Sequence, residues 1–353
     1  MAIFQTDFRV GGIQRSLLTL LRSDVFRHDE VDLYLFSKDY EQASELPVEV
    51  NRIFLEPLPY LCRLAPFDFF GVMVDRYRRV LPRLDYDLSI DFNGYSPDCA
   101  AAAMATDAGS RIIWVHNDYG ERMRYDKRFK VSFSLGKRKF KRFDSLVAVS
   151  EGSLDSIQVL LGKEIPSTQY VIPNLIDAEE LFCKAAEEEV SFSSDLIKIC
   201  GMGRLDKIKG FDLLIKDFAL AREKNEDISL FIIGDGPERR HLERLAYELG
   251  VSDSVIFLGK LENPYPALAA MDAFCHEALY EGQGLVIREA QAFGLDVVVP
   301  KRLEKYNKGI SGCECVSDVL AGLKKTAPEK RRDSLDSYNR SIKAEFGKIR
   351  GGI

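Results

Sequence analysis

Two carboxylates in the sequence stand at a spacing that suits a ligand site. Glu281 lies in a glycine-containing loop, 281–284, and Glu289 follows in a predicted helix, 285–293, that ends at Gly294. Their separation is about two helical turns, so both carboxylates can face one site. Glycines let backbone N–H groups approach a ligand, and the helix N-terminus behind them favours an anion. The alternative is a solvated charge on an ordinary amphipathic helix.

Strands and helices that could position this motif alternate along the chain. The mostly apolar runs 31–37 and 228–233 predict buried parallel strands, and 13–21 and 211–224 have helical spacing. Open α/β sheets bind ligands at the carboxyl ends of their strands. The sequence therefore predicts an α/β protein with two doubly wound sheets, and it predicts that the carboxylate motif lies at the carboxyl edge of the second sheet.

Length and composition are typical of a globular protein with two domains. The chain has 353 residues, 46% hydrophobic and 29% charged, and no apolar run approaches the roughly 18 residues of a membrane span. The N-terminus lacks a basic flank and a long apolar core, so we expect no signal peptide. Seven scattered cysteines without Cys-x-x-Cys indicate reduced thiols in a cytoplasmic protein and no zinc site. The net charge of −6 argues against a nucleic-acid partner.

Polar residues also follow other predicted strands. His116 comes directly after an apolar strand, where open α/β sheets bind ligands, although a single histidine is often structural. The stretch 197–210 begins like a dinucleotide fingerprint, but Asp206 replaces its third glycine, which argues against an NAD enzyme. The Asp-x-Asp at 85–87 precedes the predicted strand 88–92, so we interpret it as a turn and predict no metal site.

The segment 122–142 is densely basic, although the whole chain is acidic. It suits an anionic acceptor, a lipid-pyrophosphate or an anionic leaflet, at about 1 kcal/mol per basic side chain near the surface. The alternative is a solvated face. Segment 60–84 mixes aromatic residues with arginines, and it is either a core-packing helix or an amphipathic segment on a membrane. The residues predicted to face the acceptor or membrane include Arg122, Arg124, Lys137, Arg138, Lys139 and Lys141.

The carboxylate motif resembles the signature of glycosyltransferase family 4, whose members are retaining enzymes of the GT-B fold. Tyr-Glu-Gly-x-Gly surrounds Glu281, and Glu-Ala-x-Ala-x-Gly begins at Glu289. The family pattern Gly-Arg-…-Lys-Gly matches at Arg204 and Lys209. The resemblance covers nearly the whole chain, most strongly over 201–300.

Other positions of this sequence match the family less specifically. The opening Gly-Gly-x-x-Arg of family members is similar to the stretch holding Gly12 and Arg15, which the resemblance places beside the donor phosphates and the acceptor. Two departures are visible. Ala278 replaces the usual serine before Tyr-Glu-Gly, and a shorter, basic segment, 301–312, replaces the usual glycine-rich one.

The resemblance implies a role for each matching residue. Glu289 would bind the ribose hydroxyls, and Glu281 would lie closest to the sugar hydroxyls and the reaction centre. Arg204 and Lys209 would neutralise the departing diphosphate and make a divalent metal unnecessary. His116 would contact the transferred sugar. The remaining donor-binding residues would be Gly12, Gly234, Gly259, Lys260, Gly282, Gln283, Gly284, Leu285 and Val286, of which the last two would offer backbone N–H groups to the diphosphate.

We therefore expect the GT-B fold, with two Rossmann-like domains facing across a cleft. The expected divisions are an N-terminal domain at 1–177, a linker at 178–195, a nucleotide-sugar-binding domain at 196–330 and a terminal helix within 331–353 that crosses back to the N-terminal domain.

The expected function is that of a retaining, metal-independent glycosyltransferase without a cofactor, cytoplasmic and peripheral on the inner membrane leaflet. It would move a hexose or N-acetylhexosamine from a nucleotide sugar, UDP-linked, to a saccharide or lipid-linked saccharide in surface polysaccharide biosynthesis. One alternative is a GT-B epimerase or phosphorylase, and another is a non-catalytic subunit that binds nucleotide sugars.

Overall fold

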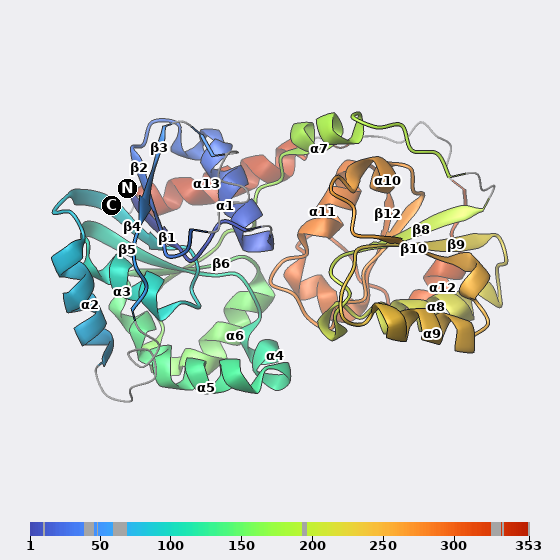
Figure 1. The fold of residues 1–353 in the computed structure, drawn as a ribbon, viewed down its shortest axis with the longest axis horizontal. Helices are drawn as coiled ribbons and strands as arrows, with labels where there is room; N and C mark the ends of the chain where they lie inside the picture. The colour runs from blue at the N-terminus through green and yellow to red at the C-terminus, as the bar shows by residue number, and fades with distance from the viewer. Residues whose placement is uncertain are drawn as a thin grey trace. The chain divides into compact units, whose positions relative to one another are not determined.

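The computed structural model describes residues 1–9, 11–38, 46–47, 49–58, 69–192, 196–325, 333 and 335–351. The chain divides into two compact units (Figure 1): unit 1 is Met1–Leu175 with Tyr338–Ile353, and unit 2 is Ile176–Ser337. Of the predicted amphipathic segment 60–84, the part 60–68 lies outside the described residues.

Unit 1 contains, in its described residues, a parallel sheet of seven strands in the order β3-β2-β1-β4-β5-β6-β7. The middle strands are buried on both faces, as the predicted apolar runs require. Consecutive residues of β1, Ile3 and Phe4, belong to cores on opposite faces, because side chains alternate along a strand. The strands are β1 (Ala2–Gln5), β2 (Val31–Leu35), β3 (Val50–Phe54), β4 (Asp85–Asp91), β5 (Asp107–Val115), β6 (Ser145–Ala148) and β7 (Thr168–Val171).

Helices cover both faces of this sheet. Figure 1 shows α1 and α13 on one side and α3, α5 and α6 on the other, and the two cores have the same division. Side chains of Ser96, Asp118 and Asp126 cap the N-termini of α3, α4 and α5. The helices are α1 (Gly12–Arg22), η1 (Asp24–Phe26), α2 (Phe69–Val80), α3 (Pro97–Ala105), α4 (Tyr119–Tyr125), α5 (Lys127–Gly136), η4 (Lys137–Arg142), α6 (Glu151–Leu161), η5 (Gly162–Glu164) and α13 (Asp336–Gly351).

The terminal helix α13 packs into the core of unit 1. The Phe346 ring lies 6.0 Å from that of Phe26 and 5.6 Å from that of Trp114, measured between centroids. Lys343 pairs with Asp24 at 2.6 Å between Nζ and Oδ1. The last helix of the chain is therefore part of the fold of the N-terminal sheet. Residues 331–332, which the expected helix segment included, lie outside the described residues.

Unit 2 contains, in the part that the structure describes, a parallel sheet of five strands in the order β10-β9-β8-β11-β12. Figure 1 shows α7, α10 and α11 on one side of it and α8, α9 and α12 on the other. The strands are β8 (Ile197–Met202), β9 (Ile228–Ile233), β10 (Val255–Gly259), β11 (Ala273–Cys275) and β12 (Asp296–Val298). The helices are α7 (Ala178–Ala185), η6 (Lys207–Lys209), α8 (Phe211–Arg222), α9 (Arg239–Glu248), η7 (Ser252–Ser254), α10 (Tyr265–Ala269), α11 (Leu285–Ala292), η8 (Lys301–Tyr306) and α12 (Val316–Ala321).

The Asp-x-Asp at 85–87 is not a turn. These residues begin β4, and Asp85 pairs with Asp107 of β5 in the parallel register. Tyr86 is buried, and its hydroxyl donates to Asp32 at 2.6 Å. Burial of this tyrosine draws the residues on either side of it into the strand.

The stretch predicted as a linker, 178–195, begins with a helix. The side chain of Asp177 accepts a hydrogen bond from the backbone N–H of Glu180 at 3.0 Å and caps α7. The Phe182 ring on α7 packs edge-on against Phe293, with centroids 5.7 Å apart. A capped, packed helix therefore occupies the start of this stretch, and 193–195 lie outside the described residues.

Candidate active site

Two loops of unit 2 bring the predicted charged residues together. Strands β8 and β11 are parallel neighbours, so the loops that follow them lie at the same edge of the sheet. The first loop carries Arg204 and Lys209, and the second carries Glu281. Residues far apart in the sequence thus meet at the carboxyl edge of this sheet.

Lys209, His276 and Glu281 form one hydrogen-bonded cluster. Lys209 Nζ donates to Glu281 Oε1 at 2.5 Å, and His276 Nε2 lies 2.9 Å from the same oxygen. The exposed fractions of the side chains are 28% for Lys209, 12% for Glu281 and 3% for His276. The cluster is therefore well shielded from water, and its electrostatic interactions are stronger than those of a surface pair.

The carboxyl of Glu281 is held in its ionised form. Burial acts to raise its pKa, but the Lys209 charge and the His276 hydrogen bond outweigh burial and lower the pKa from 4.5 to about 2. Glu281 therefore carries a negative charge throughout the neutral range.

The backbone between these side chains is closely docked. Leu279 N–H donates to the carbonyl of Ile208 at 2.8 Å. Gly210 has φ of 63°, and a Cβ at this position would lie 2.1 Å from the carbonyl oxygen of Glu277. Only glycine tolerates both conditions. The residue after Lys209 must therefore be glycine for steric reasons.

The second carboxylate of the motif, Glu289, is buried on α11. It is 4% exposed, and Gln283 in the preceding loop is 8% exposed. Neither Glu281 nor Glu289 is a solvated charge on a helix face. A role in binding ribose hydroxyls stays a prediction for Glu289, as do backbone contacts of Leu285 and Val286 with a diphosphate.

The predicted glycine turns lie at the same edge of the unit 2 sheet. Gly234 follows β9 and has φ of 137°, and a Cβ on it would lie 1.9 Å from the carbonyl oxygen of Gly203. Its N–H donates to the carbonyl of Gly259 at 2.8 Å, and Lys260 beside it is exposed. The loops after β8, β9 and β10 are therefore in contact around these glycines.

Arg204 lies in the loop after β8 but outside the cluster. Its side chain is 73% exposed, and its Nε is 3.9 Å from Asp206 Oδ2.

The predicted residues of unit 1 lie at the carboxyl edge of its own sheet. His116 follows β5 and is buried, and its Nε2 donates to the Phe92 carbonyl at 2.7 Å. Burial lowers the pKa of His116 to about 3, so its ring is neutral at neutral pH. Gly12 is the first residue of α1, and Arg15 lies on the first turn of this helix, with its N–H donating to the Gly11 carbonyl at 2.9 Å.

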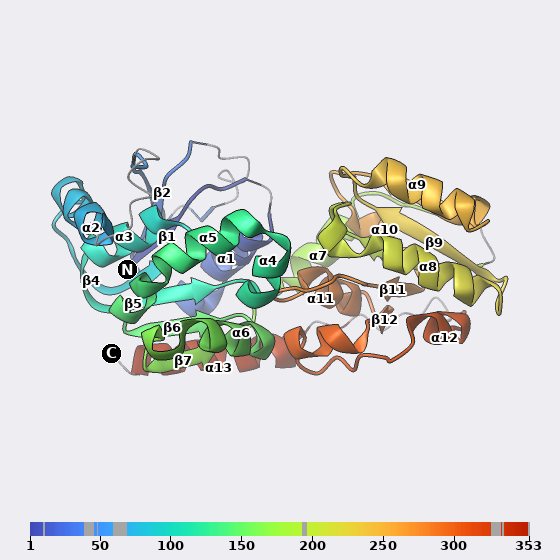
Figure 2. The same cartoon turned by 90° about the horizontal axis from the view of Figure 1, so that it is seen from below.

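The basic side chains of segment 122–142 differ in their exposure and in their partners. Figure 2 shows α4 and α5, which carry its first part, one after the other in unit 1. On α4, Arg124 pairs with Glu121 at 2.9 Å, and the guanidinium of Arg122 lies over the rings of Tyr95 and Phe129. In η4, Arg138 is exposed and Lys137 is half-buried.

Lys139 does not face an acceptor or a membrane, contrary to the prediction. It is 8% exposed, and its Nζ donates to the carbonyl of Gly94 at 3.0 Å. Burial lowers its pKa, whereas the nearby Asp91 carboxylate acts to raise it. The next residue, Phe140, is buried in the core, so this turn of η4 faces inward. Lys141 is more than half exposed and pairs with Glu164 at 3.0 Å.

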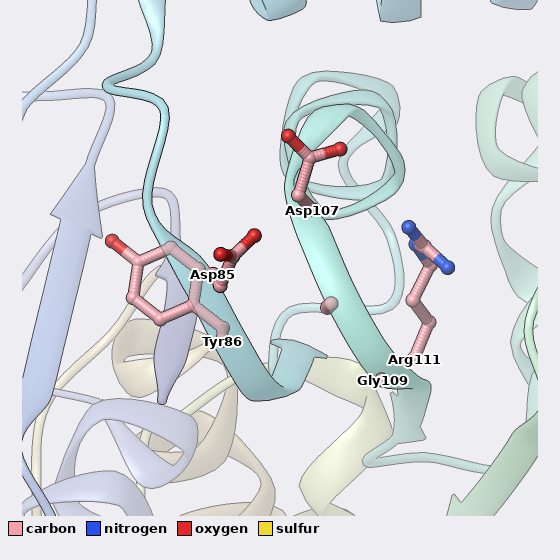
Figure 3. A pocket seen from close by; sticks show the side chains of 6 residues that line it. Asp85, Tyr86, Asp107, Gly109 and Arg111 are labelled. Atoms are coloured by element: carbon pink, nitrogen blue, oxygen red, sulfur yellow. The ribbon is translucent and has the colours of Figure 1, made fainter.

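A polar depression of ≈340 Å³ lies at the opposite, amino edge of the unit 1 sheet. Figure 3 shows Asp85 and Tyr86 on β4 and Asp107 and Arg111 on β5 around it. Asp85 and Asp107 begin β4 and β5, whereas His116 follows the other end of β5. The depression is therefore separate from the residues predicted to bind the donor.

His276 is the member of the cluster that sequence reasoning missed. Its position gives the same signal as that of His116, because His276 directly follows the apolar strand β11.

Comparisons with known proteins agree with this architecture. The model of the family described as "Glycosyltransferase Family 4" matches residues 10–180, and that of "Glycosyl transferases group 1" matches residues 184–304. The lipopolysaccharide core biosynthesis glycosyltransferase LpsD of Rhizobium meliloti is 37% identical over 33% of this chain and 33% of that protein. The match thus spans about a third of that relative's length. An uncharacterized glycosyltransferase of Haemophilus influenzae is 25% identical over 81% of this chain and 78% of that protein.

A solved structure shows the same fold. The crystal structure of HepE from Anabaena in complex with UDP has a TM-score of 0.68 at 17% identity, and the match covers 100% of this chain and 99% of that one. The predicted GT-B fold is confirmed. The two family models together match most of the chain, so the protein belongs to glycosyltransferase family 4.

Proposed function

We propose that the protein is a retaining, metal-independent glycosyltransferase that uses a UDP-linked hexose or N-acetylhexosamine. The acceptor would be a hydroxyl of a saccharide or lipid-linked saccharide. The observation that carries the proposal is the shielded cluster of Lys209, His276 and Glu281 at the carboxyl edge of the unit 2 sheet. A binding protein would not need a cation aimed at a leaving phosphate.

Lys209 would stabilise the leaving group. Negative charge grows on the β-phosphate as the bond to the sugar breaks, and a fixed ammonium is most effective where water is excluded. Its side chain is 28% exposed, so it is shielded yet reachable. Arg204, which is far more exposed, would close onto the diphosphate from the same loop. Together these two cations would take the place of a divalent metal.

Glu281 would act on the sugar. Lys209 and His276 both contact its Oε1, so Oε2 is the oxygen that would accept a sugar hydroxyl. Because its pKa is about 2, the carboxylate stays charged while positive charge develops at the anomeric carbon. Such a carboxylate interacts more strongly with the transition state than with the ground state.

The basic segment would place the protein on an anionic surface. On α5, Val131 and Leu135 are 60% and 51% exposed and lie one turn apart, close in sequence to exposed Lys127, Arg128 and Lys130. Exposed apolar side chains among basic ones are typical of a helix that lies in a membrane interface. In the described residues, no helix is both long and apolar enough to cross a membrane. The names of LpsD, which refers to lipopolysaccharide, and of the UDP complex of HepE agree with a lipid-linked acceptor and a UDP donor.

The test is product analysis with purified protein. UDP-sugars are offered singly with lipid-linked saccharides, UDP release is measured, and the anomeric configuration of the product is determined by NMR. We expect UDP release that depends on the acceptor, and a product that keeps the configuration of the donor. An inverted product would contradict the retaining assignment.

The same experiment separates the alternatives. An epimerase would convert the donor without any acceptor, and a phosphorylase would require phosphate. A non-catalytic subunit would bind UDP without turnover of any sugar in the panel. Each of these outcomes would replace the proposal.

A further inference from the structure

The side chain of Arg302 forms hydrogen bonds to backbone carbonyls just before Glu281. Arg302 lies in η8, and its Nε donates to the carbonyl of Ala278 at 3.1 Å. Its Nη2 donates to the carbonyl of Glu277 at 2.6 Å and also to the carboxylate of Glu277. The planar guanidinium thus spans two successive carbonyls, a geometry that the single ammonium of lysine cannot reproduce.

The other side of the same segment rests on the Lys209 loop. Leu279 N–H bonds to the carbonyl of Ile208, and the carbonyl of Glu277 lies directly against Gly210. Lys209 stands between those two contacts. Segment 277–279 is therefore held between the Lys209 loop and Arg302, and Glu281 begins two residues beyond it.

The ion pair of Arg302 and Glu277 requires the desolvation of a carboxylate, which opposes folding. Glu277 is 2% exposed, and burial raises its pKa. Its Oε1 has no hydrogen-bond partner among the described residues. The Arg302 side chain is 39% exposed, so only the carboxylate of the pair is fully buried. An ion pair that buries a charge is weak evidence of a stabilising role.

Arg302 lies in the basic segment 301–312. We propose that Arg302, with Glu277, is a positioning residue that sets the placement of Glu281 against Lys209 for the reaction. The inference rests on the proposed function and adds to it a residue that does not touch the substrate.

The test compares three variants with a matched control. Arg302→Met removes the guanidinium and leaves Glu277 buried and unpaired, so we expect a lower Tm and lower activity. The double variant Arg302→Met with Glu277→Met removes both charges, so we expect Tm to recover. We expect kcat to stay about 10–100-fold below wild type, with a smaller change in the KM for the donor, because a misplacement of about 1 Å can cost 10²-fold in rate. The control is Lys301→Met. The native Lys301 side chain is 59% exposed and pairs with Glu304, so its replacement should change neither Tm nor kcat.

Arg302→Lys keeps the charge beside Glu277 but loses the planar guanidinium that donates to two carbonyls. We expect a folded protein with kcat reduced about 10-fold, an effect that a purely structural charge pair would not produce. Wild-type kcat in a folded double variant, or in Arg302→Lys, would overturn the inference. If the double variant does not fold, the kcat of Arg302→Lys alone tests the inference.

Failure of the proposed function would be recognised separately. If wild-type protein turns over no nucleotide sugar, the proposed function is wrong, and the inference is judged by NMR titration of a ¹³C-labelled Glu281 carboxyl. We expect Arg302→Lys to raise the pKa of Glu281 from about 2 towards 4.5, because its contact with Lys209 loosens. An unchanged pKa would overturn the inference.

Discussion

Replacing Glu281 by glutamine tests the charge cluster directly. The folded protein lowers the pKa of this carboxyl from 4.5 to about 2. Each pKa unit corresponds to about 1.4 kcal/mol, so ionised Glu281 contributes roughly 3 kcal/mol to the free energy of unfolding at neutral pH. Domains of this size lose about 2–4 °C of Tm per kcal/mol, which predicts a Tm lower by roughly 6–12 °C for Glu281→Gln at pH 7.

The pH dependence follows from the sign of the shift. A carboxyl whose pKa is lowered by folding stabilises the protein above its unfolded pKa, near 4.5, and loses this contribution as pH falls towards about 2. The difference between wild type and Glu281→Gln should therefore be full at pH 7 and fall to roughly 1.4 kcal/mol at pH 3.

Urea unfolding at pH 7, 5, 4 and 3 measures this difference. The control is Glu243→Gln on α9, which removes a surface pair with Arg239 of 2.8 Å and should change the free energy of unfolding by about 0.5 kcal/mol. A difference for Glu281→Gln that is no larger than that of the control at pH 7, or one that stays constant down to pH 3, would refute the reasoning.

Further predictions concern catalysis and binding. Arg204→Ala should lower kcat by about 10²–10³ with little change in Tm, because its side chain is largely exposed; near-wild-type turnover would contradict its role. Activity should survive exhaustive EDTA treatment, and loss that Mg²⁺ or Mn²⁺ restores would show a metal requirement. Replacing Lys137, Arg138 and Lys141 with glutamine, like raising the salt, should weaken binding to anionic vesicles; equal binding to neutral vesicles would favour a solvated face. Glu289→Gln should raise the donor KM more than it lowers kcat, and steady-state kinetics showing the reverse would exclude a uniform ribose contact.

Much of the architecture could be predicted because the signals are local. Buried parallel strands are apolar runs, and loops that follow neighbouring strands meet at one edge. That rule predicts that Lys209 and Glu281 lie at the same edge, and the pairing of β8 with β11 in the structure brings them into contact. The glycine at 210 was visible in the motif, but its steric reason, the close approach of the Glu277 carbonyl, needed coordinates.

Other features depend on which way a side chain points. Lys139 stands in an unbroken basic run, and nothing in its own type indicates that η4 turns it towards the carbonyl of Gly94. The nearest signal was Phe140, an aromatic residue that the core would bury. The contacts of Arg302 join segments that no periodicity relates, so they could not be predicted from the sequence.

The geometry of the cluster would let Lys209 pair with either of two anions, the Glu281 carboxylate or a bound diphosphate. Without a donor, Lys209 neutralises a buried carboxylate that would otherwise carry a large desolvation cost. A bound diphosphate would compete for the same ammonium. His276 contacts the same carboxylate oxygen from another position, so Glu281 would stay oriented while Lys209 shifts towards the phosphate. Two partners on one oxygen would therefore allow Lys209 to move towards a phosphate while His276 still holds Glu281.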